Sequence, residues 1–378
     1  MTAKLLIGPC PNYVRLESGR ACPHFRRRIL TDLGRIPDLQ LAQPPFDFTL
    51  GANIYLPESA NGIGKRTMSS DVALSSRVRY MRNLAGQRFP TVADSTESIE
   101  VMNRVINAVK LVEPNIVINR SVTAREREKL LAQRLISPNF QWSLPGRAVL
   151  YTKDRTVSIL VNEEDHIRVQ AVNAADSIQR AESTAKGFLE RLEERLTFAK
   201  STQQGYLASS VYNCGEGRRY STMMHLVGLG HDESRGQVFD ALLEKKITVR
   251  GLFGEGSRPI GAFAQVSTTL ASLGEFMGAI DYLTDRERET RASLEVPKLR
   301  RKAKEALEYV RASPRISLPN AFRILGWLRW AAATRLEGFP SDLTRIDTAL
   351  NSLDLLMHEN EEYADGKRAD TLRDLLSL

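Results

Sequence analysis

The chain has 378 residues, of which 42% are hydrophobic and 26% charged, and 53 Lys and Arg against 45 Asp and Glu give a net charge of +8. This length exceeds one ordinary small domain, and the apolar content excludes a disordered chain. No apolar run of about 18 residues predicts a membrane span, and the N-terminus lacks a secretory apolar core, so we expect a cytoplasmic protein that does not enter the membrane.

Residues 1–70 are rich in Pro and Gly and carry 9 Lys and Arg against 5 Asp and Glu. Their hydrophobic periodicity is poor, which predicts an N-terminal extension of unknown role. Cys10, Cys22 and His24 could supply three zinc ligands, but no fourth follows at ligand spacing, so ordinary thiols are favoured and we predict no metal site. With Cys214 the chain has an odd number of cysteines, which argues against a disulfide framework.

From Asp71 onward the pattern changes to that of a folded domain. Asp94 followed by Glu97 predicts a helix start, since apolar residues then recur at helical spacing as far as Val109. Two β-rich runs, 148–152 and 156–161, flank a polar turn and predict an antiparallel hairpin, with a third strand at 167–172.

A long amphipathic helix is predicted over 178–196 and a strand over 223–229. Hairpins and helices in irregular order favour an α+β fold, a mostly antiparallel β-sheet flanked by helices, over a doubly wound parallel one. We therefore expect a catalytic-size domain over 71–295.

After residue 295 the chain is helical and basic. Pro314 and Pro319 separate helices, and further helices are predicted over 321–336 and 343–356. We expect a C-terminal all-helical domain over 296–378. This domain could mediate the formation of a homodimer.

Two arginines open the folded region, in the segment Ser75-Ser-Arg77-Val-Arg79. Residues two apart on a strand project to the same face, so both guanidinium groups could bind one polyphosphate. Taken alone, a solvated strand edge is the favoured interpretation.

The segment Asn162-Glu-Glu-Asp-His-Ile-Arg168 places three carboxylates and a histidine at the end of an apolar strand. Like charges that crowd together are costly unless they bind a cation or a guanidinium. Neighbouring residues rarely converge on one metal ion, so binding of a guanidinium is favoured over metal ligation.

Two Gly-rich segments also contain arginines. Asn213-Cys-Gly-Glu-Gly-Arg-Arg219 offers backbone N–H groups and guanidinium groups to phosphate oxygens, although it is not a Walker loop. The segment from Val249 to Ser257, which includes Arg250 and Glu255, could instead be a plain turn.

In their order and in their amino-acid sequences, these segments together resemble the ATP:guanido phosphotransferases. This family comprises arginine kinases, creatine kinases and bacterial protein-arginine kinases. The resemblance runs from about residue 71 to the C-terminus. It is strongest to the bacterial type, because Val249-Arg-Gly-Leu-Phe-Gly-Glu-Gly-Ser257 matches that group and a C-terminal helical domain follows.

The resemblance implies the guanido kinase catalytic fold, which is glutamine-synthetase-like, with ATP and Mg²⁺ as cofactors. It implies a nucleotide site formed by Arg77, Arg79, Arg168, Arg219 and Arg250 together with Ser75 and Asn213. Glu164 matches the family's catalytic base and Glu255 its second carboxylate.

Two positions depart from the family pattern. The active-site cysteine aligns with Ser210, and Cys214 lies at a position that is normally apolar. In the phosphoarginine-binding motif of the bacterial kinases, Asp365 and Arg368 remain but the first arginine is lost, so an allosteric role for this pair is doubtful.

We therefore expect a kinase whose partners are proteins that bear arginine. The alternatives are a catalytically silent regulator that binds phosphoarginine or a partner protein, and a phosphagen kinase that acts on free arginine. Nucleic acid is disfavoured as a partner, because aromatics make up just 7% of the chain and do not cluster near the arginines.

Overall fold

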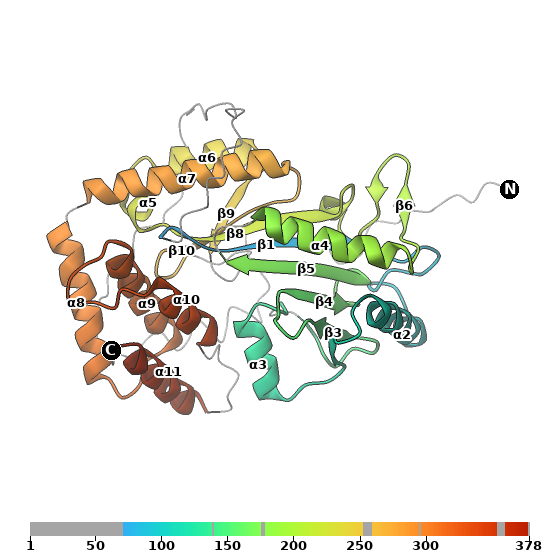
Figure 1. Ribbon diagram of the computed structural model, residues 1–378, viewed down its shortest axis with the longest axis horizontal. Helices are drawn as coiled ribbons and strands as arrows, with labels where there is room; N and C mark the ends of the chain where they lie inside the picture. The colour runs from blue at the N-terminus through green and yellow to red at the C-terminus, as the bar shows by residue number, and fades with distance from the viewer. Residues whose placement is uncertain are drawn as a thin grey trace, which may run out of the picture. The chain divides into compact units, whose positions relative to one another are not determined.

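The computed structural model describes residues 71–137, 140–174, 178–251, 259–294, 296–353 and 360–376. The predicted N-terminal extension over 1–70, the hypothetical ligands Cys10, Cys22 and His24, and Glu255 lie outside these ranges. Within them the chain forms an eight-stranded sheet and flanking helices (Figure 1).

Every strand of this sheet pairs with its neighbours in antiparallel register. The predicted α+β class is therefore confirmed. The order across the sheet is β2 (Val117–Asn119), β3 (Ala148–Tyr151), β4 (Val157–Val161), β5 (Ile167–Ala174), β1 (Ala73–Arg82), β8 (Arg218–His225), β10 (Phe263–Thr268) and β9 (Thr248–Gly251). A separate short hairpin consists of β6 (Lys200–Ser201) and β7 (Gly205–Tyr206).

One face of the sheet is covered by helices. Alternate residues of the central strands, such as Val78 and Val169, are completely buried in a core that they share with these helices. Figure 1 shows α4 lying along β1 and β5. The helices that contribute to this core or adjoin it are α2 (Ser95–Val112), α4 (Ile178–Glu193), α5 (Val227–His231), α6 (Arg235–Glu244) and α7 (Leu273–Ser293).

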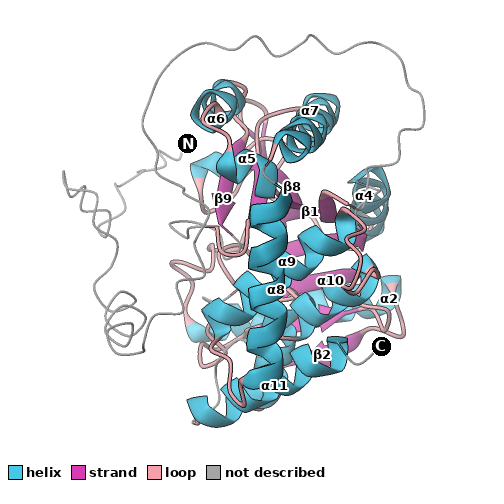
Figure 2. Ribbon diagram, turned by 90° about the vertical axis from the view of Figure 1, so that its left-hand side faces the viewer, coloured by secondary structure: helices cyan, strands magenta, loops and turns pink. Residues whose placement is uncertain are grey.

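The opposite face is covered at both ends. At one end, α3 (Ala124–Ala132) packs Leu130 and Leu131 against Val149 and Leu160. At the other, Met223 and Phe263 pack in a core with the C-terminal helices, which Figure 2 shows facing the viewer. These are α8 (Val296–Ala312), α9 (Leu318–Ala333), α10 (Leu343–Ser352) and α11 (Glu361–Leu376).

The elements predicted between 94 and 196 are confirmed. Asp94 caps α2 by accepting a hydrogen bond from the Glu97 N–H at 3.0 Å. The hairpin and the third strand are β3, β4 and β5, and the long amphipathic helix is α4. The predicted domain boundaries at 70 and 295 stay predictions.

The strand predicted over 223–229 is wrong in its second half. β8 ends at His225, and α5 begins at Val227. The carboxylate of Glu287 accepts hydrogen bonds from the N–H groups of Gly228 and Leu229, at 2.8 and 2.9 Å. A residue distant in sequence thus accepts the hydrogen bonds of the free N–H groups at the start of this short helix. Local hydrophobicity cannot reveal such a partner.

The contact of α9 with the sheet depends on two glycines. A Cβ on Gly326 would lie 2.2 Å from the carbonyl oxygen of Gly261, in the turn that precedes β10. The reverse substitution is equally crowded, because a Cβ on Gly261 would meet the Phe322 carbonyl oxygen at 2.2 Å. No helix in the described ranges is both long and apolar enough to cross a membrane.

We predict that Gly326→Ala lowers the free energy of unfolding by about 1–3 kcal/mol, because the added methyl group must push α9 away from the turn. Gly278→Ala is the matched control, since Gly278 is also helical and no atom lies within 4 Å of its Cβ position. The control should gain up to about 1 kcal/mol from helix propensity. Urea unfolding measures both, and a gain in both variants would contradict the close approach of α9.

Candidate active site

Five arginines share the face of the sheet that α4 does not cover. In the register, Arg79 lies opposite Arg219 on β8, and Met81, two residues further along β1, lies opposite Arg168 on β5. Arg250 on β9 lies opposite Gln265 of β10, which lies opposite Met223 of β8, and Met223 lies opposite Ser75 of β1. Residues directly opposite in antiparallel strands point to the same side, so β1, β5, β8 and β9 each contribute arginines to one face. We call this cluster the arginine face; it comprises Arg77, Arg79, Arg168, Arg219 and Arg250.

Small hydroxyl side chains lie between these arginines. Arg77 Nε donates to Ser221 Oγ at 3.4 Å, and Arg219 Nη2 donates to Ser267 Oγ at 3.0 Å. Ser75 lies two residues before Arg77 on β1 and therefore points to the same side. The predicted common orientation of Arg77 and Arg79 is confirmed.

The arginines perturb one another electrostatically. Burial and the charges of neighbouring arginines lower the pKa of Arg77 to about 9, and the pKa of Arg79 falls well below its ordinary value for the same reasons. The Glu163 carboxylate opposes the shift at Arg79 and forms an ion pair with Arg168 Nη1 at 2.5 Å. Crowded like charges of this kind mark a site whose charge an anionic ligand would balance.

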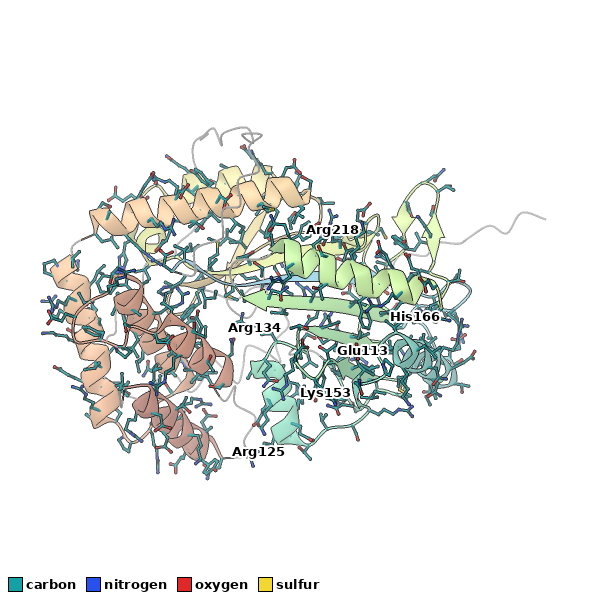
Figure 3. The ribbon with its side chains drawn as sticks, viewed as in Figure 1. Glu113, Arg125, Arg134, Lys153, His166 and Arg218 are labelled. Atoms are coloured by element: carbon teal, nitrogen blue, oxygen red, sulfur yellow. The ribbon has the colours of Figure 1, made fainter. Side chains whose placement is uncertain are left out.

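Arg218 points to the opposite side of β8 from Arg219. It lies opposite Tyr80 in the register, over the ring of Tyr220 and 4.0 Å from Glu182 of α4. Figure 3 shows Arg218 next to α4. Arg218 is therefore a neighbour of the arginine face and not a member of it.

Glu164 is exposed in the loop between β4 and β5, and the residues around it hold that loop in place. Asp165 accepts a hydrogen bond from Asn83 Nδ2 at 2.7 Å. His166 accepts from the Leu84 N–H at 3.0 Å and bonds the Arg88 carbonyl oxygen through Nε2 at 2.9 Å, as expected for a residue that supports the backbone. Hydrogen bonds to Asn83, Leu84 and Arg88 thus hold the charged loop in place, while Glu164 is exposed.

A second loop, residues 208–214, is fastened to the first. Ser209 Oγ donates to the Glu164 carbonyl oxygen at 2.6 Å, and the Ser209 N–H donates to Asp165 Oδ1 at 2.7 Å. Ser210 directly follows and precedes a short 3₁₀ turn, Val211–Asn213, in which Val211 and Tyr212 are each 78% exposed. The structure therefore brings Ser210 next to the Glu164 loop, while Asn213 lies at the end of the 3₁₀ turn, where its N–H donates to the Ser210 carbonyl oxygen at 2.9 Å.

Sequence reasoning missed two residues of this site. Ser209 joins the two loops, although nothing in its local sequence distinguishes it from Ser210. Arg134 follows α3, and its charge contributes to the lowered pKa of Arg77. A positive φ of 57° at a non-glycine residue marks Arg134 as unusual, but that signal exists only in the structure.

The C-terminal pair lies away from these loops. Arg368 is almost completely buried and forms ion pairs with Asp365 and with Glu361 at 3.0 Å, all within α11. His225, at the end of β8, is also buried and bonds the Gly261 carbonyl oxygen at 3.2 Å. Burial lowers the pKa of His225 well below its ordinary value, so it is neutral.

Comparison with known proteins agrees with this site. Residues 98–276 match the family model of the ATP:guanido phosphotransferase C-terminal catalytic domain. A protein-arginine kinase of Moorella thermoacetica is 35% identical over 239 residues, which cover 60% of this chain and 68% of the relative. One from Halothermothrix orenii is 36% identical over 200 residues, which cover 52% and 57%. The chain belongs to the ATP:guanido phosphotransferase family.

Solved structures show the same fold at lower identity. The crystal structure of a lombricine kinase matches with a TM-score of 0.54 and 19% identity, over 66% of this chain and 75% of that one. A duplicated taurocyamine kinase from Schistosoma mansoni, with bound transition state analogue components, matches with a TM-score of 0.52 and 19% identity, over 62% and 36%. The predicted guanido kinase fold is thus confirmed.

We predict that Arg219→Gln weakens the binding of inorganic tripolyphosphate at least about tenfold, because a charge-assisted hydrogen bond to the anion is lost. Arg218→Gln is the control, since the neighbouring side chain lies on the opposite side of the strand. Isothermal titration calorimetry on both variants measures the difference. Equal losses would show that the whole basic surface, and not the arginine face, attracts the anion.

Proposed function

We propose that the protein is an ATP-dependent kinase that transfers the γ-phosphoryl group to the guanidinium of arginine side chains in proteins. The observation that carries this proposal is the arginine face, whose five arginines point to one side of the sheet and whose Arg168 pairs with Glu163, the neighbour of Glu164. Phosphoryl transfer depends mainly on neutralising phosphate charge and on alignment, and this arrangement can supply both.

The arginine face would bind the phosphates of ATP. Each guanidinium can donate two parallel hydrogen bonds to phosphate oxygens, and placement on rigid strands avoids a cost of ordering when the nucleotide binds. By the resemblance, Ser75 on β1 and Asn213 at the end of the 208–214 loop would extend the same site.

The acceptor side requires carboxylates. A free guanidinium has a pKa above about 12, so it attacks phosphorus only when a carboxylate orients it and accepts a proton. We assign Glu164 as the principal base, and by resemblance Glu255 as a second carboxylate. The two hydrogen bonds from Ser209 and the one from Asn83 keep the backbone of the Glu164 loop fixed.

Mg²⁺ belongs to this proposal as a partner of ATP. Within the described ranges, His, Cys, Asp and Glu side chains do not gather in a group of three that could hold a metal ion. We therefore propose that the phosphate oxygens hold most of its coordination sphere. When bound, Mg²⁺ would neutralise charge on the β- and γ-phosphates.

Arginine in proteins is the proposed acceptor because relatives that are 30%, 35% and 36% identical to this chain are named protein-arginine kinases. A silent regulator is the second candidate, favoured by Ser210 in place of the family cysteine. The buried ion pair of Asp365 with Arg368 offers it little support, since that guanidinium is already engaged. A homodimer through the C-terminal helices and a cytoplasmic location remain predictions.

The proposal is tested by incubating the protein with γ-labelled ATP and either an arginine-rich protein or free arginine. Acid-labile label on the protein is the expected result. Label on free arginine alone would indicate a phosphagen kinase, and no transfer to either acceptor would favour the regulator.

We predict that Glu164→Gln lowers kcat by about 10²–10⁴-fold while the Kd for ATP stays unchanged, because the amide cannot accept the proton. Glu190→Gln, on the exposed side of α4, should leave both quantities unchanged. Retained turnover in Glu164→Gln would contradict the assignment of this base.

We predict that Ser210→Cys raises kcat roughly tenfold, because a thiolate beside the acceptor guanidinium adds a charge-assisted interaction that a neutral hydroxyl lacks. The substitution is made in a Cys214→Ser background, so that the new thiol is the one near the Glu164 loop. An unchanged rate from pH 7 to 9 would show that this position does not influence the acceptor.

A further inference from the structure

We infer that Arg82, the last residue of β1, and Asn83, which follows it, are positioning residues that fix the two sides of the site relative to each other. Arg82 holds the glycine-rich segment 213–217, which leads into Arg219, and Asn83 holds the loop that presents Glu164. The inference rests on the proposed function, because it assigns these two sides to ATP and to the acceptor guanidinium.

Arg82 lies on the side of β1 opposite the arginine face. It shares that side with Tyr80, whose hydroxyl donates to Glu182 of α4 at 2.6 Å, whereas Arg77 and Arg79 point the other way. Arg82 is also buried, with 3% of its surface exposed. Its guanidinium therefore points away from a phosphate bound at the arginine face, and any effect that it has on ATP is indirect.

The Arg82 guanidinium holds the glycine-rich segment by its backbone. Nη1 donates to the carbonyl oxygens of Glu216 and Gly217, at 3.0 and 3.4 Å, and to that of Met81 at 2.8 Å. Gly217 has a positive φ of 57°, and a Cβ at this residue would lie 2.5 Å from Arg82 Nη1. Glycine at 217 therefore makes room for the guanidinium, and the guanidinium fixes the turn two residues before Arg219.

Tyr206 connects Arg82 to the same segment. The guanidinium carbon lies 3.5 Å from the centre of the Tyr206 ring, which is a stacking contact. The Tyr206 N–H donates to the Gly215 carbonyl oxygen at 2.8 Å, and its carbonyl oxygen accepts from the Gly215 N–H at 3.0 Å. The hydroxyl donates to Glu193, so both ends of this tyrosine are held. Arg82 and Tyr206 thus fix the glycine-rich segment together.

Asn83 holds the acceptor side of the site. This residue is completely buried; its Oδ1 accepts from the His166 N–H at 2.9 Å, and its Nδ2 donates to Asp165 Oδ1 at 2.7 Å. Nδ2 also donates to the Leu207 carbonyl oxygen at 3.2 Å, one residue before the second loop of the site. One amide therefore holds the two residues that follow Glu164 and the start of the loop that is fastened to them.

The two anchors are neighbours in the chain, at the end of a strand that is paired on both sides. Consecutive Cα atoms are about 3.8 Å apart across a trans peptide, so neither anchor can shift without moving the other. Transfer of a phosphoryl group requires the acceptor nitrogen in line with phosphorus, and a misplacement of about 1 Å can cost about 10²-fold in rate. Arg82 and Asn83 would set this alignment without contact to either substrate.

The test is to measure two quantities on variants of the full-length chain. Isothermal titration calorimetry gives the Kd and the number of sites for MgATP, and kcat is measured with an arginine-rich protein as acceptor. We expect Arg82→Met to weaken MgATP binding about tenfold with kcat at saturating ATP retained, because the donors to the glycine-rich segment are lost. Arg82→Lys, which keeps one donor group, should weaken it only about threefold.

Asn83→Ala should have the opposite signature. We expect kcat to fall about ten- to hundredfold while the Kd for MgATP stays unchanged, because the Glu164 loop shifts and the arginine face does not. Two controls should leave both quantities unchanged. Arg191→Met removes an exposed arginine that lies over the Phe188 ring on α4, and Asn119→Ala removes an amide on the strand β2.

The opposite signatures separate positioning from a structural effect. If Arg82→Met and Asn83→Ala both reduce the number of ATP sites and reduce kcat in the same proportion, they act only on stability and the inference fails. It also fails if Arg82→Met lowers kcat as much as Asn83→Ala does, or if both variants behave as the wild type.

A variant of Tyr206 keeps the inference testable should Arg82→Met not fold. Tyr206→Leu removes the ring next to the guanidinium and should weaken MgATP binding about threefold, whereas Tyr206→Phe keeps the ring and should not. Equal Kd values for these two variants would contradict the inference. Failure of the proposed function is recognised separately, because the wild-type protein itself would then bind no ATP or transfer no phosphate.

Discussion

Repulsion among the guanidinium groups of the arginine face is the constraint that the rest of the structure must satisfy. Arg77 and Arg79 are two residues apart on one strand, and Arg219 lies directly opposite Arg79 on the next. A flexible chain would relieve this repulsion by turning side chains outward. An antiparallel sheet prevents that relief, because register and alternation fix which side each residue points to. The sheet therefore holds the charges in place until an anion compensates them.

The carboxylates near this face act on the backbone and on single arginines rather than neutralising the cluster. Glu163 pairs with Arg168, while Asp165 Oδ1 accepts hydrogen bonds from Asn83 Nδ2 and from the Ser209 N–H. Had Glu163 and Asp165 both faced the central arginines, the phosphates of a ligand would have to displace them. The sequence of three adjacent acids thus produces three different roles, because each residue points in a different direction.

Local patterns in the sequence were sufficient for the strands and helices that carry these residues. The spacing of Arg77 and Arg79 predicts a shared face, and Asp94 with Glu97 predicts the start of α2. Contacts between distant segments were not predictable in this way. The helix at Val227 depends on Glu287, and the backbone of Arg134 is held by Gln170. Neither pair has a signal in either local sequence, since each forms only when the sheet brings the segments together.

One departure from the family pattern lies in the loop next to Glu164, and the structure limits what it can change. Ser210, Val211 and Tyr212 occupy the loop that the backbone and hydroxyl of Ser209 fasten to the Glu164 loop. These bonds do not involve the side chain at position 210, so its replacement leaves the position of the loop intact. What is lost is the negative charge that a thiolate would place beside the acceptor. Under the proposed function, that loss would weaken polarisation of the guanidinium without disturbing the arginine face that we propose to hold the phosphates.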